Sequence, residues 1–199
     1  YKLTEISTQP GYVRNTNPYT FILSPTDTDS TLNIENDYTK LHVYKKDMGT
    51  GENLPGAELA IYASGDFDPA TGMPIQNAVP YAEWISGFDA YVLEKIPVGD
   101  YLLVEKSAPE GYAKAKNTIF AVDEIETVQD LILENDYIKV EVSKFDKDGT
   151  TYLPGAKLAL YERSEFNDDL TLKDNATPYL TWTTDLMSYP VYRIPAGEY

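Results

Sequence analysis

The feature that most constrains the fold of this chain is an internal repeat with a period of about 99 residues. The segment Glu35–Tyr38 recurs as Glu134–Tyr137, and Leu54–Ala57 recurs as Leu153–Ala156, each pair separated by 99 positions. Self-similarity at a fixed period indicates an array of similar structural units. The sequence therefore predicts tandem modules of about 99 residues rather than one large domain.

The repeat divides the chain into three parts. Residues 39–137 hold every repeated segment once and are predicted to form a complete module. Residues 1–38 resemble the C-terminal part of that module, and residues 138–199 resemble its N-terminal part. Because Tyr1 is not a natural start, we expect both ends to be cut from a longer chain.

One strand carries a chemical oddity. Residues 101–105 (Tyr-Leu-Leu-Val-Glu) are apolar on both faces, so this strand is predicted to be buried on both sides, with Glu105 beside Leu103. A buried carboxylate is costly unless it is paired or protonated. Residues 1–5 repeat the pattern and place Glu5 at the equivalent position.

Short strands separated by turn residues follow one another along the whole chain, with no helical period. About seven strands in 100 residues predict an all-β, Ig-like antiparallel β-sandwich, and Trp84 and Trp182 are expected in the module cores. The loop at 64–80 is long, with room for one short strand. The predicted strands are 1–5, 18–23, 32–36, 41–46, 57–63, 81–85, 90–93, 101–105, 117–122 and 130–135.

Composition narrows the function classes. The chain is 42% hydrophobic, which is ample for independent cores, and its lack of cysteine excludes disulfides and cysteine-based sites. A net charge of −16 argues against nucleic acid or an anionic membrane as partner. No apolar run approaches the roughly 20 residues of a membrane helix. We predict no cofactor, and no metal site at Asp66-x-Asp68 or at Asp146-x-Asp148, because the spaced ligands of a calcium loop are missing.

Three motifs together resemble the B-type repeat domains of the collagen adhesin Cna, also called SpaA-like pilin domains, of Gram-positive surface proteins. The first is Lys45-x-Asp47 followed by Leu54–Ala57. The second runs from Pro97 through Glu105 to the Ala-Pro-Glu-Gly-Tyr segment, and the third is Asn135 at the end of the last strand. In residues 1–38, Gln-Pro replaces the Ala-Pro-Glu of the second motif.

This resemblance implies an intramolecular isopeptide bond between Lys45 and Asn135, with Glu105 as the catalytic residue. Alternation places Lys45 with Leu41 and Val43 on the inner face of its strand, and Asn135 with the leucines of the last strand. Burial favours a neutral lysine amine, which is a nucleophile, and a protonated glutamic acid that can shuttle protons to the departing ammonia. The cross-link forms once per molecule, so the chain is not expected to be an enzyme.

The partial modules contain the same three residue types in separated segments. Lys144 lies in residues 138–199, whereas the catalytic Glu5 and the cross-linking Asn36 lie in residues 1–38. If Tyr199 and Tyr1 occupy one position, the join repeats Pro97 to Glu105 without a gap. The two parts would then form one module, either along a continuous polypeptide with a 198-residue repeat, which we favour, or between complementing subunits.

Two simpler interpretations stand beside the cross-link: a buried Lys45–Glu105 salt bridge, and Asn135 as a turn residue. The expected function is a stalk or fibre shaft outside the cell, attached to the cell surface or cell wall, whose partners are neighbouring identical modules. A host or matrix ligand would be bound elsewhere in the full protein. The alternative is an adhesive module that binds a ligand through the long loops at 64–80 and 163–178.

Overall fold

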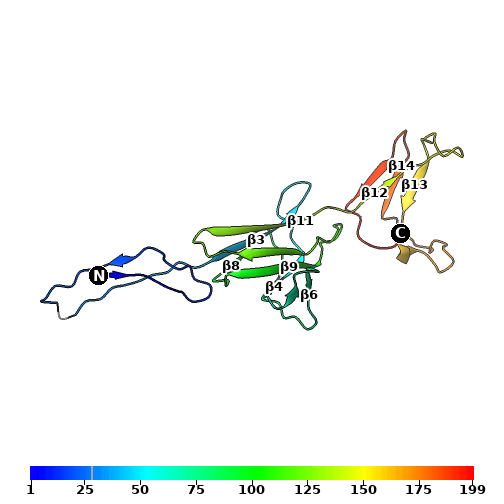
Figure 1. Ribbon diagram of the computed structural model, residues 1–199. Coiled ribbons are helices and arrows are strands. Elements are labelled where there is room, and N and C mark those ends of the chain that lie inside the picture. The colour runs from blue at the N-terminus through cyan, green and yellow to red at the C-terminus, as the bar shows by residue number, and fades with distance from the viewer. Residues whose placement is uncertain (28) are drawn as a thin grey trace. The chain divides into compact units, whose positions relative to one another are not determined.

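The computed structural model of the protein describes residues 1–27 and 29–199, which form two compact units (Figure 1). The first unit consists of residues 1–108 and 114–135, and the second of residues 109–113 and 136–199. The first unit contains most of the predicted complete module together with the segment that precedes it, and residues 109–113 and 136–137 of the module fall in the second unit. The regular structure of both units is almost entirely β-strand, as the sequence predicts.

The complete module is a β-sandwich of two sheets. One sheet has four antiparallel strands in the order β10-β9-β4-β7, and the other has three strands in the order β11-β3-β8. The strands of the first sheet are β4 (Glu58–Ala63), β7 (Ala82–Ile85), β9 (Gly99–Ser107) and β10 (Thr118–Val122). Those of the second are β3 (Lys40–Asp47), β8 (Tyr91–Glu94) and β11 (Val128–Asn135).

The first and last strands of the module, β3 and β11, are neighbours and run parallel. Leu131 pairs with Val43, Leu133 with Lys45, and Asn135 with Asp47. The other pairings within the two sheets are antiparallel. Because the first and last strands lie side by side, a bond between them would close the module at both ends of its sequence.

The main core lies between the two sheets and explains the alternation of β3. Its residues are buried at every second position, with Leu41 and Val43 each 2% exposed. They pack against inward-facing residues of β4, β9, β10 and β11, namely Leu59, Ile61, Tyr101, Leu103, Val122 and Leu133. Trp84 packs at the edge of this core and stacks on Tyr91 with ring centroids 4.2 Å apart.

The long loop at 64–80 covers the outer face of the four-stranded sheet. It forms a small hairpin of β5 (Phe67–Asp68) and β6 (Met73–Pro74), and Phe67 is buried against Leu102 and Val104. Strand β9 therefore has apolar neighbours on both faces, and its residues 101–105 are all buried, as predicted.

Residues 1–38 contain less regular structure than the sequence predicts. Strands β1 (Lys2–Leu3) and β2 (Tyr19–Thr20) pair antiparallel but are only two residues long. The predicted strand at 32–36 does not form, and Leu32 and Ile34 are more than 40% exposed. The physical reason is a missing partner, since the equivalent strand β11 pairs with β3 and residues 1–38 contain no counterpart of β3.

The second unit repeats two strand pairings of the complete module. Strand β12 (Lys139–Val142) pairs with β15 (Tyr189–Tyr192), and β13 (Lys157–Leu160) pairs with β14 (Leu180–Thr183). Val140 opposite Val191 corresponds to Leu41 opposite Leu93, and Leu158 opposite Trp182 corresponds to Leu59 opposite Trp84. A short 3-10 helix, η1 (Arg163–Glu165), follows β13.

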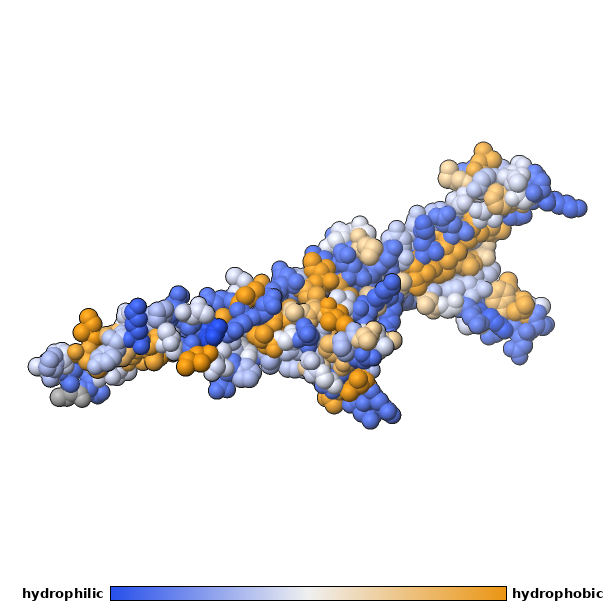
Figure 2. Space-filling view, in the orientation of Figure 1, coloured by the Kyte–Doolittle hydropathy of each residue, from blue (hydrophilic) through white to orange (hydrophobic). Residues whose placement is uncertain are grey.

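Only a small core is buried in this second unit. Trp182 is 8% exposed and stacks on Tyr189, and Val191 and Ile194 are also buried. Figure 2 shows hydrophobic surface along this unit. The exposed apolar residues include Val140, Leu153, Leu186 and Met187. Residues 138–199 thus have the strand registers of the module without the strands that would cover them.

Candidate cross-linking site

Lys45 points into the main core from β3. It follows Leu41 and Val43 on the inner face, and the residue is only 3% exposed. The lysine continues the alternation of the strand, so the same pattern that buries the leucine and the valine carries the amine inward. Its Nζ donates a hydrogen bond to the carbonyl oxygen of Leu133 on the neighbouring strand β11, at 3.3 Å.

Glu105 enters the same space from the opposite sheet. It lies in β9 beside Leu103, and both residues are completely buried. Its Oε2 accepts a hydrogen bond from the backbone N–H of Ala115 at 2.5 Å. Its Oε1 accepts no hydrogen bond from the described residues and lies 3.9 Å from Lys45 Nζ. Sequence reasoning did not identify Ala115, because a backbone donor leaves no signal in the residue type.

Asn135 completes the group from the end of β11. It is 1% exposed, and its Nδ2 donates a hydrogen bond to Glu105 Oε2 at 2.9 Å. In the parallel pair, Asn135 lies two residues beyond Leu133, the register partner of Lys45. Lysine and asparagine are therefore diagonal neighbours on the same inner face, and the structure brings together the three residues predicted for the complete module.

The electrostatics of the site favour a reactive lysine. Burial lowers the pKa of Lys45, because a charged ammonium loses its hydration inside the core, while the nearby carboxyl of Glu105 opposes this shift. The two side chains are 1% and 0% exposed, and their charged atoms are 3.9 Å apart rather than in direct contact. The site therefore holds an amine of lowered pKa near a buried carboxyl group.

Residues 1–38 contain a second glutamate–asparagine pair. Asn36 Nδ2 lies 2.9 Å from Glu5 Oε1 and 2.7 Å from Oε2, and the backbone N–H of Asn15 donates to Oε2 at 2.8 Å. These contacts reproduce those of Glu105 with Asn135 and Ala115. Both side chains are only half-buried, and the hydrogen bond from Asn36 is the main cause that lowers the pKa of Glu5.

Lys144 has the backbone environment of Lys45. The amide of Leu153 donates to its carbonyl oxygen, as that of Leu54 does to Lys45. Its half-buried amine donates to the carbonyl oxygen of Phe145 at 3.2 Å, and among the described residues no glutamate or asparagine side chain is bonded to it. The structure thus joins Glu5 to Asn36 within the first unit, whereas Lys144 belongs to the second unit.

Sequence reasoning missed the residue that fixes the Leu54–Ala57 turn. Ser86 Oγ donates to the carbonyl oxygen of Leu54 at 2.7 Å and accepts from the amide of Ala57 at 2.9 Å. Thr184 closes the equivalent turn of the second unit with the same two bonds. The signal was present, because both hydroxyl residues lie two positions after a repeated tryptophan.

The geometry defines a class of protein: a β-sandwich module with a buried Lys–Glu–Asn group between its first and last strands. Residues 39–136 match the family model of the SpaA prealbumin-like fold domain, so this module of the chain is similar to that family. The family consists of structural domains rather than enzymes, which confirms the expectation from the sequence.

Three solved structures are similar to this chain. The TIE protein of Bacillus anthracis is 21% identical with a TM-score of 0.50, over 99% of this chain and 34% of that one. A group B streptococcus pilus backbone protein is 20% identical over 65% of this chain and 53% of its own, with a TM-score of 0.42. The shaft pilin SpaA of Lactobacillus rhamnosus GG is 12% identical over 78% and 82%, with a TM-score of 0.38. No curated protein matches the chain.

Two further observations concern other kinds of site. Across residues 1–27 and 29–199, no three histidine, cysteine or acidic side chains are grouped so that they could hold a metal ion. Within the same residues, no helix has the length and apolar character needed to cross a membrane.

Proposed function

We propose that this chain is a segment of a structural stalk or fibre shaft on the outside of a Gram-positive bacterium, whose modules are locked by Lys–Asn isopeptide bonds. The observation that carries the proposal is the buried group of Lys45, Glu105 and Asn135 between the first and last strands. Similarity to the SpaA family and the likeness to proteins described as pilins support the structural role.

The reaction is a transamidation in which atoms balance without a cofactor. The neutral Lys45 amine attacks the side-chain carbonyl carbon of Asn135, a bond forms to Nζ, and the bond to Nδ2 breaks with release of ammonia. The Glu105 carboxyl takes up the proton that Nζ loses and delivers a proton to the leaving nitrogen, so that the amide forms as ammonia departs. Its contact with Asn135 Nδ2 at 2.9 Å supports this shuttle to the departing group.

Folding accelerates the cross-linking reaction by bringing its two reacting groups together. The β-strands hold amine and amide as neighbours in a site closed to water, which gives the high effective concentration that a slow amide exchange needs. The burial that lowers the pKa of Lys45 also provides the neutral nucleophile. The reaction ends after one turnover, because the lysine and the asparagine are both consumed.

The bond would have a mechanical consequence. It joins β3 to β11, so tension that enters at one end of the module passes to the other end through a covalent link instead of unfolding the sandwich. Unlike a disulfide, an amide is not reduced. A row of such modules forms an inextensible shaft, for which neighbouring modules are the partners.

Intact mass after denaturation tests the cross-link. The full chain is expected to weigh less than its sequence by one ammonia, and Glu105→Gln, which keeps the shape but not the acid, should restore the full mass. Lys46→Ala is the matched control. Lys46 follows Lys45 in the same strand but lies on its outer face, so this substitution should leave the loss of ammonia unchanged. A full mass for the unmodified chain would overturn the cross-link and leave a buried ion pair.

We also propose that residues 138–199 and residues 1–38 are the two parts of one further module, completed in the next repeat or subunit. The matching strand registers, the preformed Glu5–Asn36 pair and the equivalent position of Lys144 support this assignment. In the completed module Lys144 would be joined to Asn36 with Glu5 as the catalyst. The ligand-binding alternative would become the favoured function only if the full chain showed no loss of ammonia in its intact mass.

A further inference from the structure

Gly11 lies directly against the backbone of Lys95, a residue of the complete module that belongs to the same first unit. It has φ +85°, and a β-carbon added to it would collide with the backbone carbonyl of Lys95. Lys95, between β8 and β9, is itself left-handed with φ 58°. Two unusual backbone conformations therefore fit against each other, and only glycine can occupy the first position.

Thr39 ties these two turns together. This residue is completely buried, and its amide donates to the carbonyl oxygen of Gly11 at 3.0 Å. Its Oγ1 donates to the carbonyl oxygen of Ile96 at 2.5 Å, while its own carbonyl accepts from the amide of Lys95 at 2.9 Å. The start of the module is thus hydrogen-bonded to the segment before it and to the turn that the segment covers.

Tyrosine rings surround the cation of the same turn. Lys95 Nζ lies 5.1 Å from the ring centroid of Tyr12 and 5.6 Å from that of Tyr38, within the range of cation–π attraction. Tyr12 and Tyr38 also form an antiparallel bridge. The contact consequently combines backbone fit, hydrogen bonds and a charged group close to two aromatic rings.

The second unit contains the same arrangement. Gly111 has φ +82°, and a β-carbon on it would lie 2.6 Å from the carbonyl oxygen of Arg193, whose φ is 54°. The Arg193 guanidinium lies 5.6 Å from the Tyr112 ring, and Tyr112 forms an antiparallel bridge with Tyr137. The amide of Ile138 donates to the carbonyl oxygen of Gly111 at 2.8 Å. Every position lies 98 to 100 residues after its counterpart.

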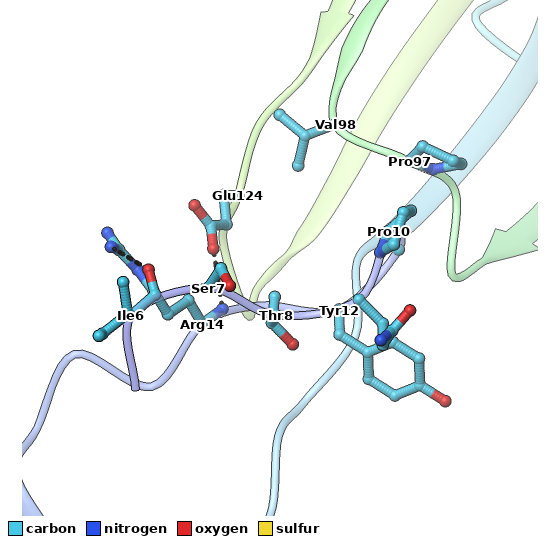
Figure 3. A pocket seen from close by; sticks show the side chains of 11 residues that line it. Ile6, Ser7, Thr8, Pro10, Tyr12, Arg14, Pro97, Val98 and Glu124 are labelled. Atoms are coloured by element: carbon cyan, nitrogen blue, oxygen red, sulfur yellow. Dashed lines mark hydrogen bonds between the residues drawn. The ribbon is translucent and has the colours of Figure 1, made fainter. Parts of the chain in front are cut away.

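A groove of about 530 Å³ runs beside the first of these contacts (Figure 3). The segment Ile6–Tyr12 forms one wall, and Pro97, Val98 and Glu124 of the module form the other. The amide of Arg14 donates to Glu124 Oε1 at 2.9 Å across it. This bond links the segment before the module to the module itself.

We infer that the Gly-Tyr turn of one module and the left-handed cationic turn of the next are the two halves of a joint, which holds consecutive modules in one orientation. The partner of each Gly-Tyr turn is the following module of the same chain. The residues are Gly11, Tyr12, Tyr38, Thr39 and Lys95 in the first joint and Gly111, Tyr112, Tyr137, Ile138 and Arg193 in the second. The joint makes the shaft resist bending, whereas the isopeptide bond makes each module resist stretching.

The absence of cysteine from the sequence allows a direct test on the full chain. Nitroxide labels on Thr16→Cys and Asp89→Cys, both exposed, report the distance between residues 1–38 and the module by electron–electron double resonance. We expect a narrow distance distribution for the labelled parent and loss of the narrow peak in Gly11→Ala. Gly51→Ala is the matched control, since Gly51 has φ +73° with nothing near its β-carbon, and it should keep the narrow peak.

Lys95→Met provides a second variant, which removes the cation without imposing backbone strain, and it should also broaden the distribution. A broad distribution in the parent, or a narrow one in both Gly11→Ala and Lys95→Met, would overturn the joint. The intact mass of each variant reports the cross-link separately, so failure of the joint and failure of the isopeptide bond are distinguished.

Amide hydrogen exchange checks both joints at single residues. Gly11→Ala should accelerate exchange of the Thr39 amide and leave that of Ile138 unchanged, whereas Gly111→Ala should do the reverse. Gly149→Ala, with φ +72° and no neighbour, is the control in the second unit. Unchanged exchange at Thr39 in Gly11→Ala and at Ile138 in Gly111→Ala would contradict the inference.

Discussion

The complete module and the two partial ones carry the same three residue types, yet only the complete module brings them together. Lys45, Glu105 and Asn135 are at most 3% exposed between two sheets. Glu5 and Asn36 form the same hydrogen bond in a half-buried setting, and Lys144 lies in a unit that buries only a small core and leaves several apolar side chains exposed. The comparison shows that strand register selects the residues, whereas closure of the second sheet creates the reactive environment.

This difference has a chemical consequence. Glu5 accepts hydrogen bonds near solvent, which stabilise its carboxylate form and lower its pKa, and its pair with Asn36 contains no lysine, so this pair is not expected to react alone. The reaction would be confined to completed sandwiches, and premature cross-linking to a wrong amide would be avoided. Folding itself would then be the switch for the cross-link.

The largest effect is expected when the missing half is supplied. Two copies of the sequence, fused so that Tyr199 and Tyr1 become one residue, would contain two complete modules and one new module at the join. The fused chain should lose three ammonias rather than two, because the join brings Lys144 of the first copy to Glu5 and Asn36 of the second. The intact mass of the denatured fusion gives the number of ammonias lost directly.

Lys144→Ala in the first copy alone is the matched control for this prediction, and it should reduce the loss from three ammonias to two. The same substitution in the second copy should change nothing, because that lysine has no partner segment. A loss of two in the unmodified fusion would break the comparison, since the halves would then not complete each other.

The next effect concerns stability. The bond from Lys45 to Asn135 closes a loop of most of the module, and the chain-entropy estimate for a covalent loop of that size is on the order of 4–5 kcal/mol. Glu105→Gln, which leaves the strands intact but prevents the bond, should lower the free energy of unfolding by about that amount. Denaturant unfolding of the full chain, monitored by fluorescence of the Trp84 region, measures it; an unchanged midpoint would show that the bond contributes no stability.

A variant that cannot form the bond should reveal the titration of the lysine. In Asn135→Ala, Lys45 remains an amine whose folded pKa is held below the ordinary lysine value by burial. Between those two pKa values the unfolded chain binds more protons than the folded one, so the free energy of unfolding should rise with pH across the alkaline range. The unmodified chain should lack this rise, because its Lys45 nitrogen is an amide.

Unfolding of Asn135→Ala at a series of pH values measures this slope. The double variant Lys45→Met with Asn135→Ala is the control and should show no such rise. A flat pH dependence in the single variant would mean that the buried amine keeps its ordinary pKa, which would remove the proposed source of the nucleophile.

Much of the site followed from the sequence because strand alternation is a local property. The inward positions of Lys45, Glu105 and Asn135 follow from the apolar residues two positions before each of them, and the structure places all three accordingly. The parallel pairing of β3 with β11 and the amide of Ala115 did not follow, since both depend on which strands meet in three dimensions.

The strand predicted at 32–36 shows the limit of such reasoning. The alternation of Leu32, Ile34 and Asn36 is real, but a strand also needs a neighbour for its backbone hydrogen bonds. The described part of residues 1–38 provides none. The joint at Gly11 was missed for a related reason. A glycine in a turn has many explanations, and only the position of Lys95 shows that this glycine is required by a contact.

The smallest expected effect concerns the Glu5–Asn36 pair of residues 1–38. The hydrogen bonds from Asn36 and from the Asn15 amide hold the pKa of Glu5 below its ordinary value. Their stabilisation is therefore complete above the unfolded glutamate pKa and is lost as the pH falls through the lowered folded pKa. The amide proton shift of Asn15, followed by NMR against pH, should give a midpoint below that of a free glutamate.

Asn36→Ala should move the midpoint upward, because the hydrogen bond from Asn36 is the largest cause of the lowered Glu5 pKa. Asn17→Ala is the control and should not move it. A midpoint above the ordinary glutamate value would show that Glu5 is already desolvated without its second sheet. The complete and partial modules would then differ only in the position of the lysine.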